Sequence, residues 1–197
     1  MNRRMFALML LAVPLMTGCG YNRIQSLTQE VDASQGMIQA QLQRRADLIP
    51  NLVNTVKGYA THEEAVFTQV TEARAGLQTA IKSGDAGQMA NADATMTGAI
   101  GRLLVVAEAY PNLKADAQFL RLQDELTGTE NRIAVARGDY NTAVKTYNTT
   151  ITQFPTVLTA KATGAKPKSY YEATNASANT APTVDFSKTA PPAGKKP

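Results

Sequence analysis

Few residues in this sequence have the type and spacing that catalysis or metal binding requires. Glu63-Glu64 and Asp124-Glu125 could support acid–base hydrolysis, but adjacent residues point to different faces of a helix. The only histidine is His62, whereas a di-iron bundle site needs Glu-x-x-His twice, and Tyr59 stands where the first Glu would be. The sequence has no serine elbow and no phosphate-binding Gly-Lys-Ser/Thr loop. We therefore expect a protein that is not an enzyme, with no metal site and no cofactor.

The only cysteine, Cys19, follows a segment typical of protein export. Arg3 and Arg4 precede an uncharged apolar run at residues 5–16, which is shorter than the roughly 20 residues of a spanning helix. An unpaired cysteine is unusual in an exported protein. Residues 1–18 are therefore predicted to be a signal peptide.

Residues 15–19, Leu-Met-Thr-Gly-Cys, resemble the lipobox of bacterial lipoproteins, although Met16 stands where leucine is usual. This resemblance implies that Cys19 carries a diacylglycerol group and becomes the mature N-terminus. The protein would then be a membrane-anchored lipoprotein of the cell envelope, and Gly20 after the cysteine favours the outer membrane, facing the periplasm. An uncleaved short anchor is the alternative.

The remainder of the chain predicts long helices. From Val31 to Leu77, apolar residues recur with alternating steps of four and three, which is close to a coiled-coil seam. Pro50 interrupts this stripe. Either Asp47 caps a new helix with Pro50 in its first turn, or one long helix bends at Pro50.

Further helices are expected at residues 88–109 and from there to Phe154. Residues 83–87 form a predicted turn, and Tyr110-Pro111 breaks or kinks the pattern. Short connections favour antiparallel neighbours, so the predicted fold is all-α, an elongated up-and-down bundle of about four helices. The expected domains are the bundle at 19–160 and a basic tail at 161–197. That tail should be largely disordered, with residues 169–172 able to dock on the bundle.

Four charged residues fall on the apolar stripes: Arg45, Glu63, Glu130 and Arg137. Buried charges are costly unless they are paired. We hypothesise a buried ion-pair network that fixes helix register. The alternative is that these residues lie at the edge of the stripe, with their charged ends in water.

Tyr140-Asn141 and Tyr147-Asn148 are one heptad apart, so both tyrosines share a face and both asparagines share another. The simpler interpretation is a core tyrosine stripe with hydrogen-bonded hydroxyls. The functional interpretation is a polar ladder that recognises a partner helix.

The net charge of +4 is concentrated at the two ends of the chain, because residues 19–160 carry a balance of −2. A nucleic-acid-binding domain would concentrate its basic residues on a folded face. No nucleic-acid partner is therefore expected.

Several motifs together resemble the LemA family of bacterial envelope proteins. The most specific is the run Arg44-Arg45-Ala46-Asp47-Leu48-Ile49-Pro50-Asn51-Leu52-Val53, and others include Glu108-Ala109-Tyr110-Pro111-Asn112-Leu113 and Phe154-Pro155. The resemblance covers about residues 21–172. It implies a membrane-anchored antiparallel four-helix bundle with no agreed catalytic activity.

Three functions are compatible with these features. The first is a non-enzymatic scaffold, held at the membrane by its N-terminal lipid, that contacts envelope proteins. The second is a carrier of a small lipid or peptide, suggested by the methionine and small-residue content of the third helix (Met89, Ala92, Met96, Gly98, Ala99, Gly101). The third, a carboxylate-dependent hydrolase, has the least support.

Overall fold

The computed structural model describes the backbone of residues 3–173 and the side chains of residues 20–173. The first helix, α1 (Arg3–Lys57), runs the whole length of the molecule. Its buried stripe from Ile24 to Val56 keeps the predicted alternation of four and three. The described residues contain helices and no strand, so the all-α prediction is confirmed.

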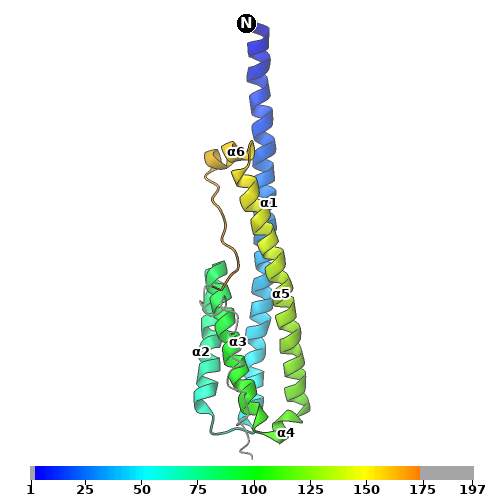
Figure 1. Cartoon of the computed structure of the whole chain (residues 1–197), viewed down its shortest axis with the longest axis vertical. Helices are drawn as coiled ribbons and strands as arrows, with labels where there is room; N and C mark the ends of the chain where they lie inside the picture. Colours follow the sequence, from blue (N-terminus) through cyan, green and yellow to red (C-terminus); the bar gives the residue numbers. More distant parts are fainter. Residues whose placement is uncertain (1–2, 174–197) are drawn as a thin grey trace, which may run out of the picture.

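Four long helices make an antiparallel bundle, as predicted (Figure 1). After α1 come α2 (Glu64–Ser83), α3 (Ala86–Glu108), the single turn α4 (Pro111–Lys114) and α5 (Ala117–Thr152). The most extensive packing joins α1 to α5 and α2 to α3. The predicted turn at 83–87 and the break at Pro111 are both present. The chain breaks a second time before α5, which the sequence analysis did not anticipate.

Pro50 lies inside α1, so of the two alternatives left open by the sequence, a new helix capped at Asp47 is wrong. Asp47 instead accepts a hydrogen bond from Gln43, one turn earlier. Proline has no N–H, and this leaves the carbonyl of Ala46 without its helical donor. Arg74 of α2 supplies the replacement, because its Nε donates to Ala46 O at 2.8 Å. A neighbouring helix thereby satisfies the group that the proline leaves free.

The chain reverses direction between α1 and α2 at residues 58–63, a turn that the sequence analysis missed. Tyr59 and Glu63 continue the stripe in sequence, but they lie in this turn rather than on a helix face. Gly58 after Lys57 is a recognised combination at helix C-termini, and this signal was available.

Short polar residues define the other helix ends. Asp85 caps α3 by accepting from Gln88 N, and Asp116 caps α5 by accepting from Gln118 N and Phe119 N. Between α2 and α3, Gly84 adopts φ 68°, a left-handed conformation that favours glycine.

The α2–α3 hairpin is shorter than the α1–α5 pair, so the molecule has two different halves (Figure 1). The hairpin turn rests on α1, where Gln35 donates to Gly84 O and Gln39 to Ile81 O. Beyond this point α1 and α5 continue without it. The short helix α6 (Thr156–Thr163) lies at the end of α5, beside α1, and residues 165–173, here called the C-terminal strap, return along both helices.

Candidate functional site

A cluster of polar side chains lies where α1, α3 and α5 face one another. Arg45 Nη1 of α1 lies 2.6 Å from Asp93 Oδ1 of α3, and both residues are buried. Arg45 Nη2 also lies 3.9 Å from Glu130 Oε2 of α5, whose side chain is 58% exposed. The cluster therefore joins three helices through one guanidinium group. The contact with Asp93 is a short, charge-assisted hydrogen bond, whereas the contact with Glu130 is longer and open to solvent.

The strap completes this cluster by placing the Tyr171 ring over it. Tyr171 is 1% exposed, and the Arg137 guanidinium lies 5.4 Å from its ring centre, within the range of a cation–π contact. The hydroxyl of Tyr171 and the Nε of Arg45 are buried without a hydrogen-bond partner among the described residues. Together these groups line a cavity of about 330 Å³.

Burial changes the acidity of two groups in the cluster. It raises the pKa of Asp93 above its usual value, although the nearby Arg45 guanidinium opposes this shift. Burial also raises the pKa of the Tyr171 hydroxyl, and the charge of Asp93 adds to this effect. Both shifts reflect poor solvation of the charged forms.

The structure brings together three of the four charges that the sequence singled out. Arg45, Glu130 and Arg137 line the same cavity, but only Arg45 is buried. Glu63 lies in the α1–α2 turn, where its backbone carbonyl accepts hydrogen bonds from Val66 N and Phe67 N. It does not line this cavity. Its assignment to the network is corrected, because the stripe does not continue through the turn.

The buried partner of Arg45, Asp93, was not among the predicted residues. It is four residues after Met89 and three before Met96, both fully buried, so it lies on the same face of α3. Its neighbour Ala92 was named among the small residues of this helix, whereas Asp93 was not named at all. An acidic residue at the apolar spacing between Met89 and Met96 was the signal that could have identified Asp93.

Two asparagines of α5 hold the strap through its backbone. Asn148 accepts from Lys168 N at 2.8 Å and donates to Lys168 O at 2.9 Å. Asn141 accepts from Tyr171 N at 2.8 Å and donates to Tyr171 O at 3.4 Å. The side-chain amides pair with the strap as a neighbouring β-strand would. The ladder foreseen at these positions thus binds the chain's own C-terminal segment and not a helix.

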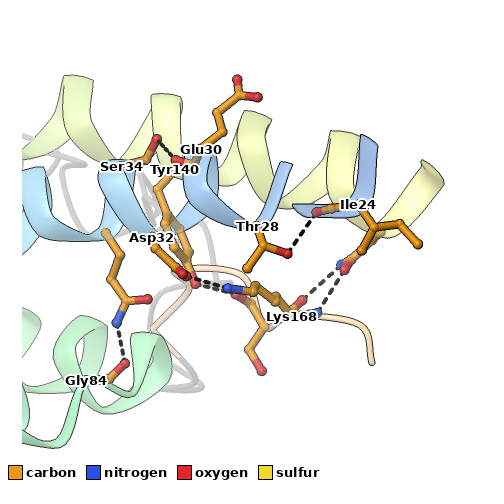
Figure 2. A network of polar contacts seen from close by, with 11 residues as sticks. Ile24, Thr28, Glu30, Asp32, Ser34, Gly84, Tyr140 and Lys168 are labelled. Atoms are coloured by element: carbon orange, nitrogen blue, oxygen red, sulfur yellow. Dashed lines mark hydrogen bonds and ion pairs between the residues drawn. The ribbon is translucent and has the colours of Figure 1, made fainter. Parts of the chain in front are cut away.

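The tyrosines of the same motifs are core residues, as the simpler interpretation held. Tyr140 and Tyr147 are buried, and the Tyr140 hydroxyl donates to Ser169 O. Figure 2 shows Tyr140 beside the ion pair between Lys168 of the strap and Asp32 of α1, which are 2.5 Å apart. The Lys168 ammonium group also lies 5.8 Å from the Tyr147 ring centre.

These contacts place the end of the folded domain later than residue 160, where the sequence predicted the boundary between the bundle and the basic tail. That position lies inside α6, and the chain stays packed on the bundle up to residue 173. The predicted docking of residues 169–172 agrees with this arrangement. The remainder of the proposed tail, residues 174–197, lies outside the described residues.

Cys19 belongs to the backbone of α1, but its side chain lies outside the described residues. The next residue, Gly20, marks where α1 meets α6, because a β-carbon at Gly20 would lie 2.8 Å from Thr159 Oγ1. Residues 3–19 extend α1 beyond this point, away from the other helices (Figure 1). Cys19 therefore lies at the junction between the bundle and the projecting helix.

A family model described as the LemA family matches residues 34–186. This chain belongs to the LemA family. The matched region holds both asparagines, the strap and the polar cluster. Cys19 and the projecting part of α1 precede the match, so the predicted lipid attachment is a separate matter from LemA membership.

The chain is also similar in sequence to several named proteins. It is 28% identical over 175 residues to magnetosome protein MamQ 2 of Paramagnetospirillum magneticum, covering 77% of this chain and 64% of that protein. Magnetosome protein MamQ of Magnetospirillum gryphiswaldense is 25% identical over 174 residues with the same coverage. Protein LemA of Metamycoplasma hominis is 24% identical over 150 residues, covering 71% and 63%. The chain thus spans somewhat less than two thirds of these relatives' length.

The part of this LemA-family chain that the structure describes contains no group of three His, Cys, Asp or Glu side chains placed to hold a metal ion. His62 lies in the α1–α2 turn. Across residues 3–173, no helix combines the length and hydropathy of a membrane span.

Proposed function

We propose that this LemA-family chain is a membrane-associated envelope protein, anchored by a lipid on Cys19, that acts as a non-enzymatic scaffold. The observation that carries the proposal is the position of Cys19, at the end of the bundle and in the sequence Leu-Met-Thr-Gly-Cys. Cleavage before Cys19 would remove the projecting apolar helix and leave the acyl chains directly at the end of the bundle. Each buried CH₂ group of those chains contributes about 0.8 kcal/mol to membrane binding.

The side chains described fit a scaffold better than an enzyme. The buried polar groups Arg45 and Asp93 neutralise each other across helices, and the Asn141 and Asn148 amides are occupied by the strap. A rigid rod anchored at one end can hold partner proteins at a defined distance from a membrane. The proposed location is the outer membrane, with the rod facing the periplasm.

Mass measurement of the full chain extracted from membranes tests the anchor. The expected product begins at Cys19 and carries the added mass of two or three acyl chains. The Cys19→Ser variant is the control and should lack this mass and leave the membrane fraction. An unmodified thiol in the wild-type protein would contradict the proposal.

Crosslinking in cells tests the scaffold role. The anchored wild-type protein should give reproducible crosslinks to other envelope proteins, whereas a consistently partner-free pattern would count against a scaffold.

One observation favours the alternative, a carrier of a small lipid or peptide. Small residues of α2 and α3 leave an open groove of about 490 Å³, lined by Gly76, Ala92, Gly98 and Ala99 and bordered by Gln69 and Arg102. The Arg102 guanidinium donates to Gln69 Oε1 across it at 2.7 Å. Native mass spectrometry of the purified protein should show a bound molecule if the groove carries one, and a ligand-free spectrum would remove this alternative.

A further inference from the structure

The end of the bundle beside Cys19 carries exposed apolar side chains that no other described part of the chain covers. Phe154, in the turn before α6, is 80% exposed, more than any other large hydrophobic residue in the described part of the chain. Leu158 of α6 is 61% exposed, and Tyr21 of α1 is 46% exposed. Isolated exposed apolar residues are common on protein surfaces, but these three lie at one end of a rod. We call this end, formed by residues 20–23 and 153–161, the tip.

The charge around the tip has a single sign. Residues 20–29 and 140–171 contain five basic residues and no Asp or Glu. Four of the five, Arg23, Lys145, Lys161 and Lys166, are exposed, and the fifth, Lys168, pairs with Asp32. The nearest acids along α1 are Glu30 and Asp32, two to three turns further from the tip. An anionic surface would meet basic groups only.

The orientation of α6 suits a flat surface. Figure 1 shows α6 lying crosswise at the end of α5 and beside α1, where the projecting residues 3–19 of α1 begin. Its contact with α1 is close, since Gly20 leaves no room for a β-carbon beside Thr159. The tip is therefore held in place by packing, with Phe154 and Leu158 exposed on it.

We infer that the tip docks into the interface of an anionic lipid bilayer, with Phe154 and Leu158 among the acyl chains and Arg23 and Lys161 at the headgroups. Amphipathic helices bind membranes with this combination of apolar side chains and flanking cations. Cations near an anionic leaflet are attracted to it over about a Debye length. The inference rests on the proposed anchoring, which brings the tip to the bilayer. It adds that the rod stands on the membrane at a fixed orientation instead of swinging on its tether.

The absence of tryptophan from the chain allows a direct test. Phe154→Trp introduces one reporter at the tip, and Val105→Trp introduces one at a 67%-exposed site near the far end of α3 as a matched control. Each full-length lipidated variant is reconstituted into vesicles of phosphatidylcholine and phosphatidylglycerol, with and without brominated acyl chains. The Phe154→Trp emission should shift to shorter wavelength and lose most of its intensity to the bromines, whereas the Val105→Trp emission should not change.

Flotation of the same samples separates the two proposals. If the protein floats with the vesicles but both reporters escape quenching, the tip does not enter the bilayer and the inference is overturned. If the protein does not float, the proposed anchoring fails and the inference fails with it. Replacement of Arg23 and Lys161 by Glu in the Phe154→Trp variant should reduce the quenching, and unchanged quenching would contradict the role of the cations.

Discussion

Among individual residues, Arg45 has the greatest structural consequence. Within the described part of the chain it is the one basic residue that is buried, and its partners come from two other helices. A buried ion pair contributes little relative to apolar packing, but removal of one partner leaves the other charge unsatisfied. The contribution of Arg45 to the stability of the fold therefore depends on the presence of Asp93.

Arg45→Met should lower the free energy of unfolding by about 3 kcal/mol, because it leaves Asp93 buried without a counter-charge. Arg137→Met should lower it by less than about 1 kcal/mol, since Arg137 is exposed and only covers the Tyr171 ring. Denaturant unfolding of both variants checks the difference. The double variant Arg45→Met/Asp93→Leu should recover most of the loss, and a double variant no more stable than Arg45→Met would argue against the pairing.

The sequence singled out two arginines for burial, Arg45 and Arg137, and only Arg45 is buried; its buried partner, Asp93, was not predicted. Glu63 and Asp93 are both acids near apolar spacings, and only the path of the chain separates them. Glu63 belongs to a turn, whereas Asp93 faces the α1–α5 pair. Which acid pairs with Arg45 depends on tertiary contacts, and the helical periodicity of a single segment gives no information about those contacts.

At the scale of elements, the continuity of α1 depends on a neighbouring helix. Helix propensity and cap signals around Pro50 favour a break as much as a bend, so the sequence left both possibilities open. The hydrogen bond from Arg74 to Ala46 O is a contact over 28 residues, and it removes much of the cost of a proline within the helix. The all-helical class, the α2–α3 turn and the break at Pro111 needed only local signals, and the sequence predicted them.

Arg74→Met should destabilise the protein by about 1–2 kcal/mol, because it leaves the buried Ala46 carbonyl without a donor. Pro50→Ala restores the helical N–H and should suppress this effect. Thermal unfolding of the single and double variants gives the coupling between the two sites. If Arg74→Met causes the same loss in the wild-type protein and in the Pro50→Ala variant, the arginine acts through some other contact.

The strap is an element held mainly by side-chain amides. Asn148→Ala removes two hydrogen bonds to Lys168 and should destabilise the docked strap by about 1–3 kcal/mol. Hydrogen exchange should show faster exchange of the Lys168 amide, with little change in α2 or α3. Asn131→Ala, on α5 but outside the strap contacts, is the control. Protection of Lys168 that survives in Asn148→Ala would contradict the proposed pairing.

At the scale of the whole molecule, the rod has a four-helix half and a half in which α1 and α5 are covered by α6 and the strap. The hairpin turn at Gly84 marks the border between them. The sequence predicted an elongated bundle but not this division, because unequal helix lengths follow from the missed turn at residues 58–63. The strap supplies the covering that a longer hairpin would have given.

The length of the rod can be measured in solution. Spin labels can be placed at Val105→Cys, near the C-terminus of α3, and at Leu158→Cys in α6, in a Cys19→Ser background. The C-terminal end of α3 and α6 lie near opposite ends of the bundle (Figure 1). At about 1.5 Å per helical residue, their separation should be on the order of 50 Å with a narrow distribution. A distance below roughly 30 Å would be incompatible with an extended four-helix arrangement.

The strap also decides where the rest of the chain leaves the rod. Ala173 lines the cavity with Arg45 and Asp93, so the polypeptide departs from the flank of the molecule and not from either extremity. A label attached at Ala173 would consequently lie beside Arg45, roughly 37 Å along α1 from Gly20 at about 1.5 Å per residue.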